Sequence, residues 1–173
     1  MEKVKVDVFN KGQNELPIYS TSLSAGFDIR ADLTKINSIK DIMGNGKIEL
    51  VINDNDEKIV KLLPGARVLI PTGLHVAIPD DYELQIRPRS GLAIKNGITV
   101  LNSTGTIDSD FRGEIGIILI NTDLDTPFEI EQGDRIAQGV LNMVEQVKWY
   151  NVDTIEELGD TKRGQGGFGH TGV

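Results

Sequence analysis

The sequence contains no cysteine among its 173 residues. That absence excludes disulfide bridges, thiolate catalysis and thiolate-bound zinc, and it suits a reducing compartment without proving one. The sequence also lacks an apolar run near the roughly 20 residues that a membrane-spanning helix needs, and no charged leader followed by an apolar stretch opens it. We therefore expect a soluble, cytoplasmic protein that has no membrane partner.

Basic residues are scarce as well. The chain has 18 Lys and Arg against 26 Asp and Glu, which gives a formal net charge of -8, and it has two histidines. An acidic protein repels a polyanion, so we do not expect nucleic acid as a partner. With two histidines and no thiol, a zinc site is not expected either. Any phosphate-bearing ligand must then be bound by a few local arginines or by another metal ion.

What the chain has instead is a series of short apolar runs separated by Pro, Gly, Asn and Asp. Val4, Val6 and Val8 alternate with polar residues, as in a half-buried strand. Many short strands with turn residues between them are typical of an all-β sandwich, barrel or jelly roll. Further runs of this kind are FDIRA, KIELVI, KIVKLL, ARVLI, LHVAI, YELQI, ITVL, EIGIILI and FEIE.

The length fits one domain, and we find no repeat or linker that divides residues 1–173. The run EIGIILI is apolar on both faces, with Ile117 on one face and Ile118 on the other. A two-sided strand in a domain of this size predicts a subunit contact in addition to a core.

Local signals for helices and turns are few. Short helices are expected at residues 37–43, capped by Asn37 or Ser38, and at DTIEEL, capped by Asp153. The acidic run NDNDE is not a helix-loop-helix calcium site, because that loop needs Gly at its sixth position, where the chain has Lys58. We interpret it as a hairpin turn between KIELVI and KIVKLL.

Five segments concentrate Gly, Ser, Asp and Arg beside the apolar runs. Taken singly, each has an ordinary explanation as a turn or a loop. Together they supply what nucleotide chemistry needs, because Arg89, Arg135 and Arg163 can pair with phosphate oxygens. Asp108 is then the natural general base. The segments are AGFDIRA, PRSGLA, NSTGTIDSDFRGEI, GDRIAQ and the C-terminal RGQGGFGHTG, in which five of ten residues are glycine.

In this order the five segments resemble the five motifs of the homotrimeric dUTP nucleotidohydrolases, the dUTPases. The resemblance runs from about Val4 to the C-terminus, and GTIDSDFRGEI with a distant RGQGGFGHTG makes it specific. It implies a jelly-roll-like dUTPase fold, a homotrimer with shared active sites, and Mg²⁺-dependent hydrolysis of dUTP. Asp108 would activate the water that attacks the α-phosphorus, leaving dUMP and pyrophosphate. Such an activity keeps uracil out of DNA and supplies dUMP for thymidylate synthesis.

The resemblance also implies which residues bind the phosphates. Arg89 and Ser90 would contact them directly, and the backbone N–H of Gly91 can add to an anion-binding concavity. Gln138 would contact phosphate too. Asp28 would lie near the phosphates and order water bound to the magnesium ion, which makes it an indirect metal ligand.

The uracil and the sugar would be bound by a tight hairpin of residues 98–110. Asn102, with backbone groups of the hairpin such as those of Gly105 and Ile107, would hydrogen-bond the uracil edge. Phe111 would pack against the deoxyribose and exclude a 2′-hydroxyl. The family usually has Tyr in its place, so we expect weaker rejection of UTP here.

The C-terminal arm, residues 162–173, resembles a lid that is flexible when empty and orders over substrate, excluding water. Within it, Arg163 would bind the γ-phosphate and Phe168 would stack over the uracil. His170 stands where the family often has Ser. The arm residues expected to contact substrate are Arg163, Phe168, Gly169, His170 and Thr171.

Two alternatives stay open. dCTP deaminases resemble this chain in fold and in related motifs, although their chemistry needs a glutamate base at the pyrimidine ring. A binding or regulatory protein that retains a nucleotide site is the other. Residues 34–63 are longer than the connection in most family members, and we expect an inserted hairpin with a short helix there. We interpret this insertion as surface decoration or an extra subunit contact, with a lobe for an unknown protein partner as the sharper hypothesis.

Overall fold

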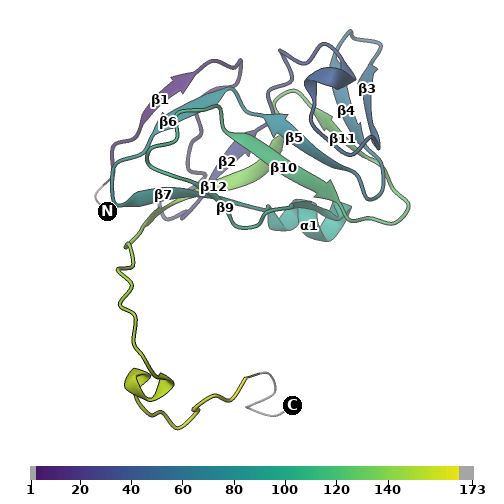
Figure 1. The fold of residues 1–173 in the computed structure, drawn as a ribbon. Helices are drawn as coiled ribbons and strands as arrows, with labels where there is room; N and C mark the ends of the chain where they lie inside the picture. Colours follow the sequence, from purple (N-terminus) through teal and green to yellow (C-terminus); the bar gives the residue numbers. More distant parts are fainter. Residues whose placement is uncertain (1–2, 168–173) are drawn as a thin grey trace.

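The computed structural model describes residues 3–167, which form twelve β-strands, one α-helix and two 3-10 helices (Figure 1). The expectation of an all-β protein with few short helices is confirmed. In chain order the elements are β1 (Asp7–Asn10), β2 (Phe27–Arg30), η1 (Ile39–Asp41), β3 (Ile48–Ile52), β4 (Lys58–Leu62), β5 (Arg67–Pro71), β6 (Leu74–Ala77), β7 (Tyr82–Arg87), α1 (Ser90–Asn96), β8 (Ile98–Val100), β9 (Gly105–Ile107), β10 (Gly116–Asn121), β11 (Phe128–Glu131), β12 (Arg135–Met143) and η2 (Ile155–Leu158).

The strands pair in antiparallel sheets. The largest sheet has the order β2-β12-β7-β9, two three-stranded sheets have the orders β5-β10-β8 and β11-β4-β3, and β1 pairs with β6. The apolar runs of the sequence did not include β9, which lies in GTID, or β12, which begins in GDRIAQ and continues to Met143. β12 is nevertheless nine residues long and lies at the centre of its sheet, between β2 and β7.

The core fills the space between these sheets with branched aliphatic side chains. Ile29 of β2, Ile70 of β5 and Ile117 of β10 are fully buried. Burial of each such side chain stabilises the fold by about 1.5–3 kcal/mol. Along β10 the odd positions face the core, whereas Ile118 and Ile120 are half-buried on the other face, so the two-sided pattern of EIGIILI is present in the structure.

The two expected helices are present as single 3-10 turns. At residues 37–43 the structure has the three-residue η1. Asn37 and Ser38 donate their backbone N–H groups to the carboxylate of Asp41, at 2.8 and 2.9 Å, so Asp41 reaches back to hold the turn. In DTIEEL the N-cap of η2 is Thr154, whose backbone N–H donates to the Glu157 carboxylate at 3.1 Å. The predicted cap Asp153 was therefore wrong, whereas Ser38, one of the two residues predicted to cap the first helix, directly precedes η1.

The segment of residues 34–63 contributes several buried side chains to the core. It forms η1, β3 and β4, and its acidic run closes the β3–β4 turn as expected, with Ile52 paired to Lys58. β4 lies between β3 and β11, and its Val60 and Leu62 are fully buried. Surface decoration was therefore the wrong interpretation for β4. Deleting this hairpin would remove the central strand of a sheet.

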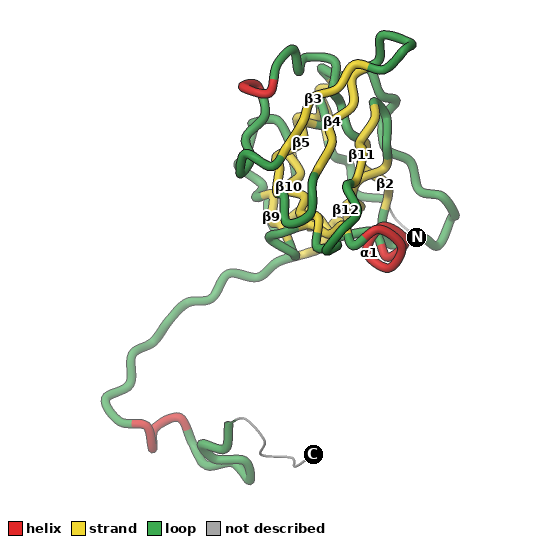
Figure 2. Tube along the Cα trace, turned by 90° about the vertical axis from the view of Figure 1, so that its right-hand side faces the viewer, coloured by secondary structure: helices red, strands yellow, loops and turns green. Residues whose placement is uncertain are grey.

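The C-terminal segment leaves β12 and stands away from the sheets. Figures 1 and 2 show residues 144–167 as an extended stretch with η2 as a single turn within it. Its apolar side chains are exposed, Trp149 at 88%. No other segment of residues 3–167 covers them. Among the same residues, no helix has the length and apolar character needed to cross a lipid bilayer.

One buried carboxylate fastens the N-terminal loop to the body. Asp32 is 4% exposed and accepts hydrogen bonds from the backbone N–H of Gln13 and of Thr34, each at 3.0 Å, and from the Thr34 hydroxyl. Burial alone raises the pKa of Asp32. The hydrogen bonds from Thr34 and Gln13 outweigh it and hold the pKa below its ordinary value.

Because the pKa of Asp32 is lower in the folded chain, the ionised carboxylate stabilises the fold at pH values above the ordinary pKa of an aspartate. This stabilisation is lost as the pH falls through the lowered pKa. We predict that Asp32→Asn lowers the free energy of unfolding by about 1–3 kcal/mol at neutral pH. The difference from the unmodified protein shrinks in acid. Urea unfolding of both proteins across this pH range measures it, and a difference independent of pH would contradict the assignment.

Candidate active site

A first polar cluster lies where β2 and β12 meet the end of β7. Asp28 of β2 receives two arginines, since Arg89 Nε donates to its Oδ1 at 2.8 Å and Arg135 Nη1 donates to its Oδ2 at 3.3 Å. Arg89 Nη1 also donates to the backbone carbonyl of Arg135 at 2.9 Å. One half-buried carboxylate therefore holds two guanidinium groups side by side, next to solvent. Such a pair of forks matches a phosphate group in charge and geometry.

The sheet register builds this cluster. Across the sheet, Asp28 is opposite Gln138 of β12, and Gln138 is opposite Arg87 of β7. The side-chain amide of Gln138 donates to the backbone carbonyl of Pro88 at 2.8 Å. That bond fixes the chain just before Arg89. In this structure Gln138 therefore supports the arginine-bearing turn through one of the two N–H donors of its amide.

Ser90 and Gly91 begin α1, where the sequence had indicated a loop. Arg89 is the N-cap with extended backbone and no side-chain cap, and Gly97 ends the helix with φ of 64°. The N–H groups of a first helical turn have no partner within the helix. Ser90 and Gly91 are exposed, and a Cβ placed on Gly91 would meet no atom within 4 Å. Both residues thus lie open to solvent beside Arg89.

A second cluster lies along β9 and the loop that follows it. Gly105 and Ile107 pair with Ile86 and Leu84 of β7. The Asn102 side chain lies over Gly105, where an added Cβ would come within 3.2 Å of Asn102 Nδ2. The expected hairpin of residues 98–110 was wrong, because β8 pairs with β10 and β9 with β7. The segment instead connects two sheets.

Asp108 and Phe111 lie in the loop after β9. Asp108 is exposed, and its backbone carbonyl accepts the N–H of Phe111 at 3.2 Å. The Phe111 ring is 40% exposed and lies on Gly113, where an added Cβ would approach the ring Cζ to 2.5 Å. Gly113 is therefore needed for this ring position. The loop presents a carboxylate and an aromatic face together.

The two clusters lie on opposite edges of the same sheet. Asp28 is on β2, one edge strand, and Asp108 follows β9, the other edge strand. With a strand spacing of about 4.8 Å, three spacings separate the edges by about 14 Å.

The clusters are also offset along the strands. Through their shared partner Gln138 on β12, Asp28 lies level with Arg87 of β7. Ile107 is opposite Leu84, which is three residues before Arg87 on β7. Asp108 is one residue further on, so the offset along the strands is four residues. At about 3.3 Å per residue the offset is about 13 Å, so the two carboxylates are about 20 Å apart in one chain. A single copy therefore carries two half-sites that do not meet.

The tail residues lie apart from both clusters. Arg163 belongs to the extended C-terminal segment, and its Nε donates to the carbonyl of Gly166 at 2.8 Å. The four other expected arm contacts, Phe168, Gly169, His170 and Thr171, lie outside the described residues. Among residues 3–167, no group of three or more His, Asp or Glu side chains is arranged to hold a metal ion.

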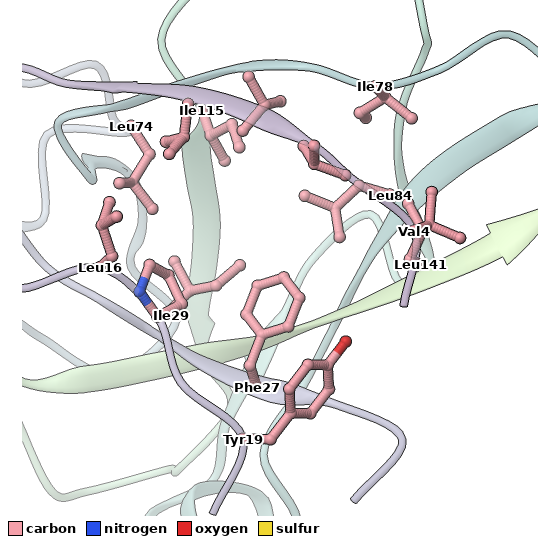
Figure 3. Close-up of a pocket in the computed structure, with 14 residues that line it drawn as sticks. Val4, Leu16, Tyr19, Phe27, Ile29, Leu74, Ile78, Leu84, Ile115 and Leu141 are labelled. Atoms are coloured by element: carbon pink, nitrogen blue, oxygen red, sulfur yellow. The ribbon is translucent and has the colours of Figure 1, made fainter. Parts of the chain in front are cut away.

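An apolar cavity of about 260 Å³ lies elsewhere, under the β1–β6 pair (Figure 3). Its labelled lining includes Ile29, Leu74 and Leu84, and the ring of Tyr19 meets that of Phe27 edge to face at 5.6 Å. The lining is aliphatic and aromatic and carries no arginine. This cavity therefore suits apolar packing, and the polar clusters remain the candidate site.

Solved structures share this architecture. The dUTPase of Staphylococcus bacteriophage 80alpha, solved with dUpNHpp, is similar with a TM-score of 0.75 at 23% identity, covering 99% of this chain and 100% of that chain. The dUTPase of phage phi11 of S. aureus is similar with a TM-score of 0.65 at 21% identity, covering 88% and 99%. The chain thus has the β-rich dUTPase fold.

Sequence comparison is more specific. A sequence model of the dUTPase family matches residues 52–172. The deoxyuridine 5'-triphosphate nucleotidohydrolase of Fusobacterium nucleatum is 45% identical over 172 residues, covering 99% of each chain. That of Chlamydia pneumoniae is 51% identical over 159 residues, covering 92% of each. The chain belongs to the dUTPase family and is an enzyme of that family.

Proposed function

We propose that this enzyme hydrolyses dUTP to dUMP and pyrophosphate in the cytoplasm, keeping uracil out of DNA and supplying dUMP for thymidylate synthesis. The observation that carries the proposal is the pair of half-sites on one sheet. One cluster offers two guanidinium groups for phosphate, and the other offers a carboxylate beside an aromatic ring. The relatives named as dUTP nucleotidohydrolases support this substrate.

The first cluster binds the triphosphate. Arg89 is oriented by Asp28 and meets the phosphates with its planar fork, while Ser90 and the N–H of Gly91 add neutral donors. Gln138 holds the turn that carries Arg89. From the arm, Arg163 binds the γ-phosphate.

The second cluster binds the nucleoside and carries out the chemistry. Asn102 and the backbone of Gly105 and Ile107 hydrogen-bond the uracil edge, and Phe111 packs against the deoxyribose. Asp108 takes a proton from the attacking water, whose oxygen bonds to the α-phosphorus. The bond from that phosphorus to the bridging oxygen breaks, and pyrophosphate leaves.

The residues of the first cluster fit a magnesium ion carried by the triphosphate. Mg²⁺ keeps several waters and binds mainly through phosphate oxygens, so it does not require a cluster of carboxylates. Asp28 offers half-buried carboxylate oxygens beside the arginines, and each can accept a further hydrogen bond from metal-bound water. When bound, the ion would neutralise charge on the phosphates.

The active assembly we propose is a homotrimer with shared sites. Because the half-sites are about 20 Å apart in one chain, the Arg89 cluster of one copy must face the Asp108 loop of another. The C-terminal segment, which stands away from its own sheets with Trp149 exposed, is then free to reach a neighbouring copy (Figure 2). Its last residues close the shared site and exclude water.

A nucleotide panel tests the activity. The purified protein is incubated with magnesium and with dUTP, dCTP, dTTP or UTP, and pyrophosphate and ammonia are assayed in parallel. We expect pyrophosphate from dUTP, with UTP turned over far less. Ammonia from dCTP would indicate a deaminase, and silence with every nucleotide would favour a binding protein.

Asp108→Asn is predicted to lower turnover of dUTP by roughly two to four orders of magnitude, because the general base is lost. Nucleotide binding is largely retained, since the arginines are intact. Asp110→Asn is the matched control, as Asp110 is exposed in the same loop. Steady-state kinetics and binding of a non-hydrolysable dUTP analogue measure both effects. Near-normal turnover of Asp108→Asn would remove this residue from the role.

Truncation after Lys162 is predicted to reduce turnover of dUTP at least tenfold without changing the thermal unfolding midpoint, because the arm acts as a lid outside the core. The removed residues up to 167 include no buried side chain. Turnover and thermal unfolding are compared with the full chain. A truncated protein with full turnover would show that the arm takes no part in catalysis.

A further inference from the structure

Arg112 is bonded to the backbone of the loop that carries Asp108 and Phe111. Its Nη1 donates to the carbonyl of Ser109 at 2.6 Å and to the carbonyl of Phe111 at 2.9 Å. One guanidinium nitrogen thus holds two backbone carbonyls that are two residues apart in the loop. The N–H of Phe111 also donates to the carbonyl of Asp108, which closes the turn of residues 108–111. These three bonds fix the path of the loop between base and aromatic ring.

His75 of β6 holds the same loop from below. Its Nδ1 lies 3.0 Å from the carbonyl oxygen of Arg112. A carbonyl can only accept, so Nδ1 is the donor in this bond. Nε2 is buried without a partner among the described residues, and the Phe9 ring packs against the imidazole with centroids 5.7 Å apart. Burial of Nε2 costs desolvation energy, and the ring is held by its single hydrogen bond, to the carbonyl of Arg112.

The loop is also anchored beyond Arg112. Glu114 accepts the backbone N–H of Gly73 at 2.8 Å, and Ile115 donates its N–H to the carbonyl of Leu74 at 2.8 Å. Gly73, Leu74 and His75 are consecutive at the start of β6. The loop of residues 108–115 is therefore bonded at several points to residues 73–75 at the start of β6. Arg112 connects these bonds to the part of the loop that carries Asp108 and Phe111.

We propose that Arg112 and His75 are positioning residues, which together form a brace that holds Asp108 and Phe111 at the angle the reaction requires. The inference rests on the proposed dUTP hydrolysis and adds to it two residues that touch no substrate. Both protruding residues are exposed, so core packing does not fix them. A general base displaced by about 1 Å can lose about a hundredfold in rate. The brace supplies the rigidity that packing does not.

Removing the guanidinium tests the brace through kinetics. Arg112→Met is expected to lower kcat for dUTP by about ten- to a hundredfold, with KM changed by less than about threefold, because the phosphate-binding arginines lie in the other half-site. The preference for dUTP over UTP falls as well, since Phe111 moves. Arg67→Met, an exposed arginine of β5, is the charge-matched control and is expected to leave both values unchanged.

Conservative variants separate positioning from folding. Arg112→Lys keeps an ammonium group that can donate to two carbonyls, and we expect it to recover part of kcat. His75→Asn retains an N–H donor close to the place of Nδ1 and is expected to keep kcat within about twofold, whereas His75→Leu loses about three- to tenfold. Equal losses of kcat in His75→Asn and His75→Leu would overturn the brace. So would full kcat together with an unchanged preference for dUTP over UTP in Arg112→Met.

Hydrogen exchange tests the brace without any assumption about activity. In the nucleotide-free protein, the amides of residues 108–113 are expected to exchange at least about tenfold faster in Arg112→Met and in His75→Leu, while those of β7 and β10 do not change. If the unmodified enzyme fails to hydrolyse dUTP, the proposed function fails and this measurement still decides the brace. Unchanged exchange in both variants would overturn the brace even in an active enzyme.

Discussion

The pairing of β2, β12, β7 and β9 into one antiparallel sheet sets the position of the groups proposed to act on dUTP. Asp28 and Arg89 lie at one edge, and the loop carrying Asp108 follows the strand at the other edge. The register is fixed because a slip by one residue would turn the buried Leu84 and Ile86 outward. The distance between the two clusters is therefore as rigid as the core, which supports the proposal that the active site is completed between copies.

Around this sheet, the other elements stabilise parts of the chain that packing alone would leave loose. The segment of residues 34–63 supplies β4, the central strand of a three-stranded sheet, whose buried Val60 and Leu62 stabilise the core. In the first half-site one carboxylate, Asp28, orients two arginines. In the second, backbone carbonyls and Gly113 set the loop. Both arrangements prepare charge and shape before substrate arrives, which is what phosphoryl transfer demands of a protein.

The sequence predicted the all-β class because period-two runs such as EIGIILI carry the burial pattern of strands, and it brought Asp28 and Arg89 into one site through the family resemblance. It missed α1, which has seven residues, a glycine at its second position and no side-chain cap. It also assumed that β8 and β9 pair with each other, although strand partners are chosen by contacts remote in sequence. The role of Arg112 was not visible in the sequence, because it bonds backbone carbonyls, which every residue has.

Mixing two inactive chains tests most directly the claim that each site is shared between copies. Arg89→Ala and Asp108→Asn chains, each expected to be nearly inactive alone, are co-refolded in equal amounts and assayed with dUTP. If sites form between copies, random assembly pairs an intact Arg89 with an intact Asp108 at about a quarter of the interfaces, and about a quarter of the unmodified activity returns. If one copy held a complete site, the mixture would stay as inactive as its parts, and the shared site would be contradicted.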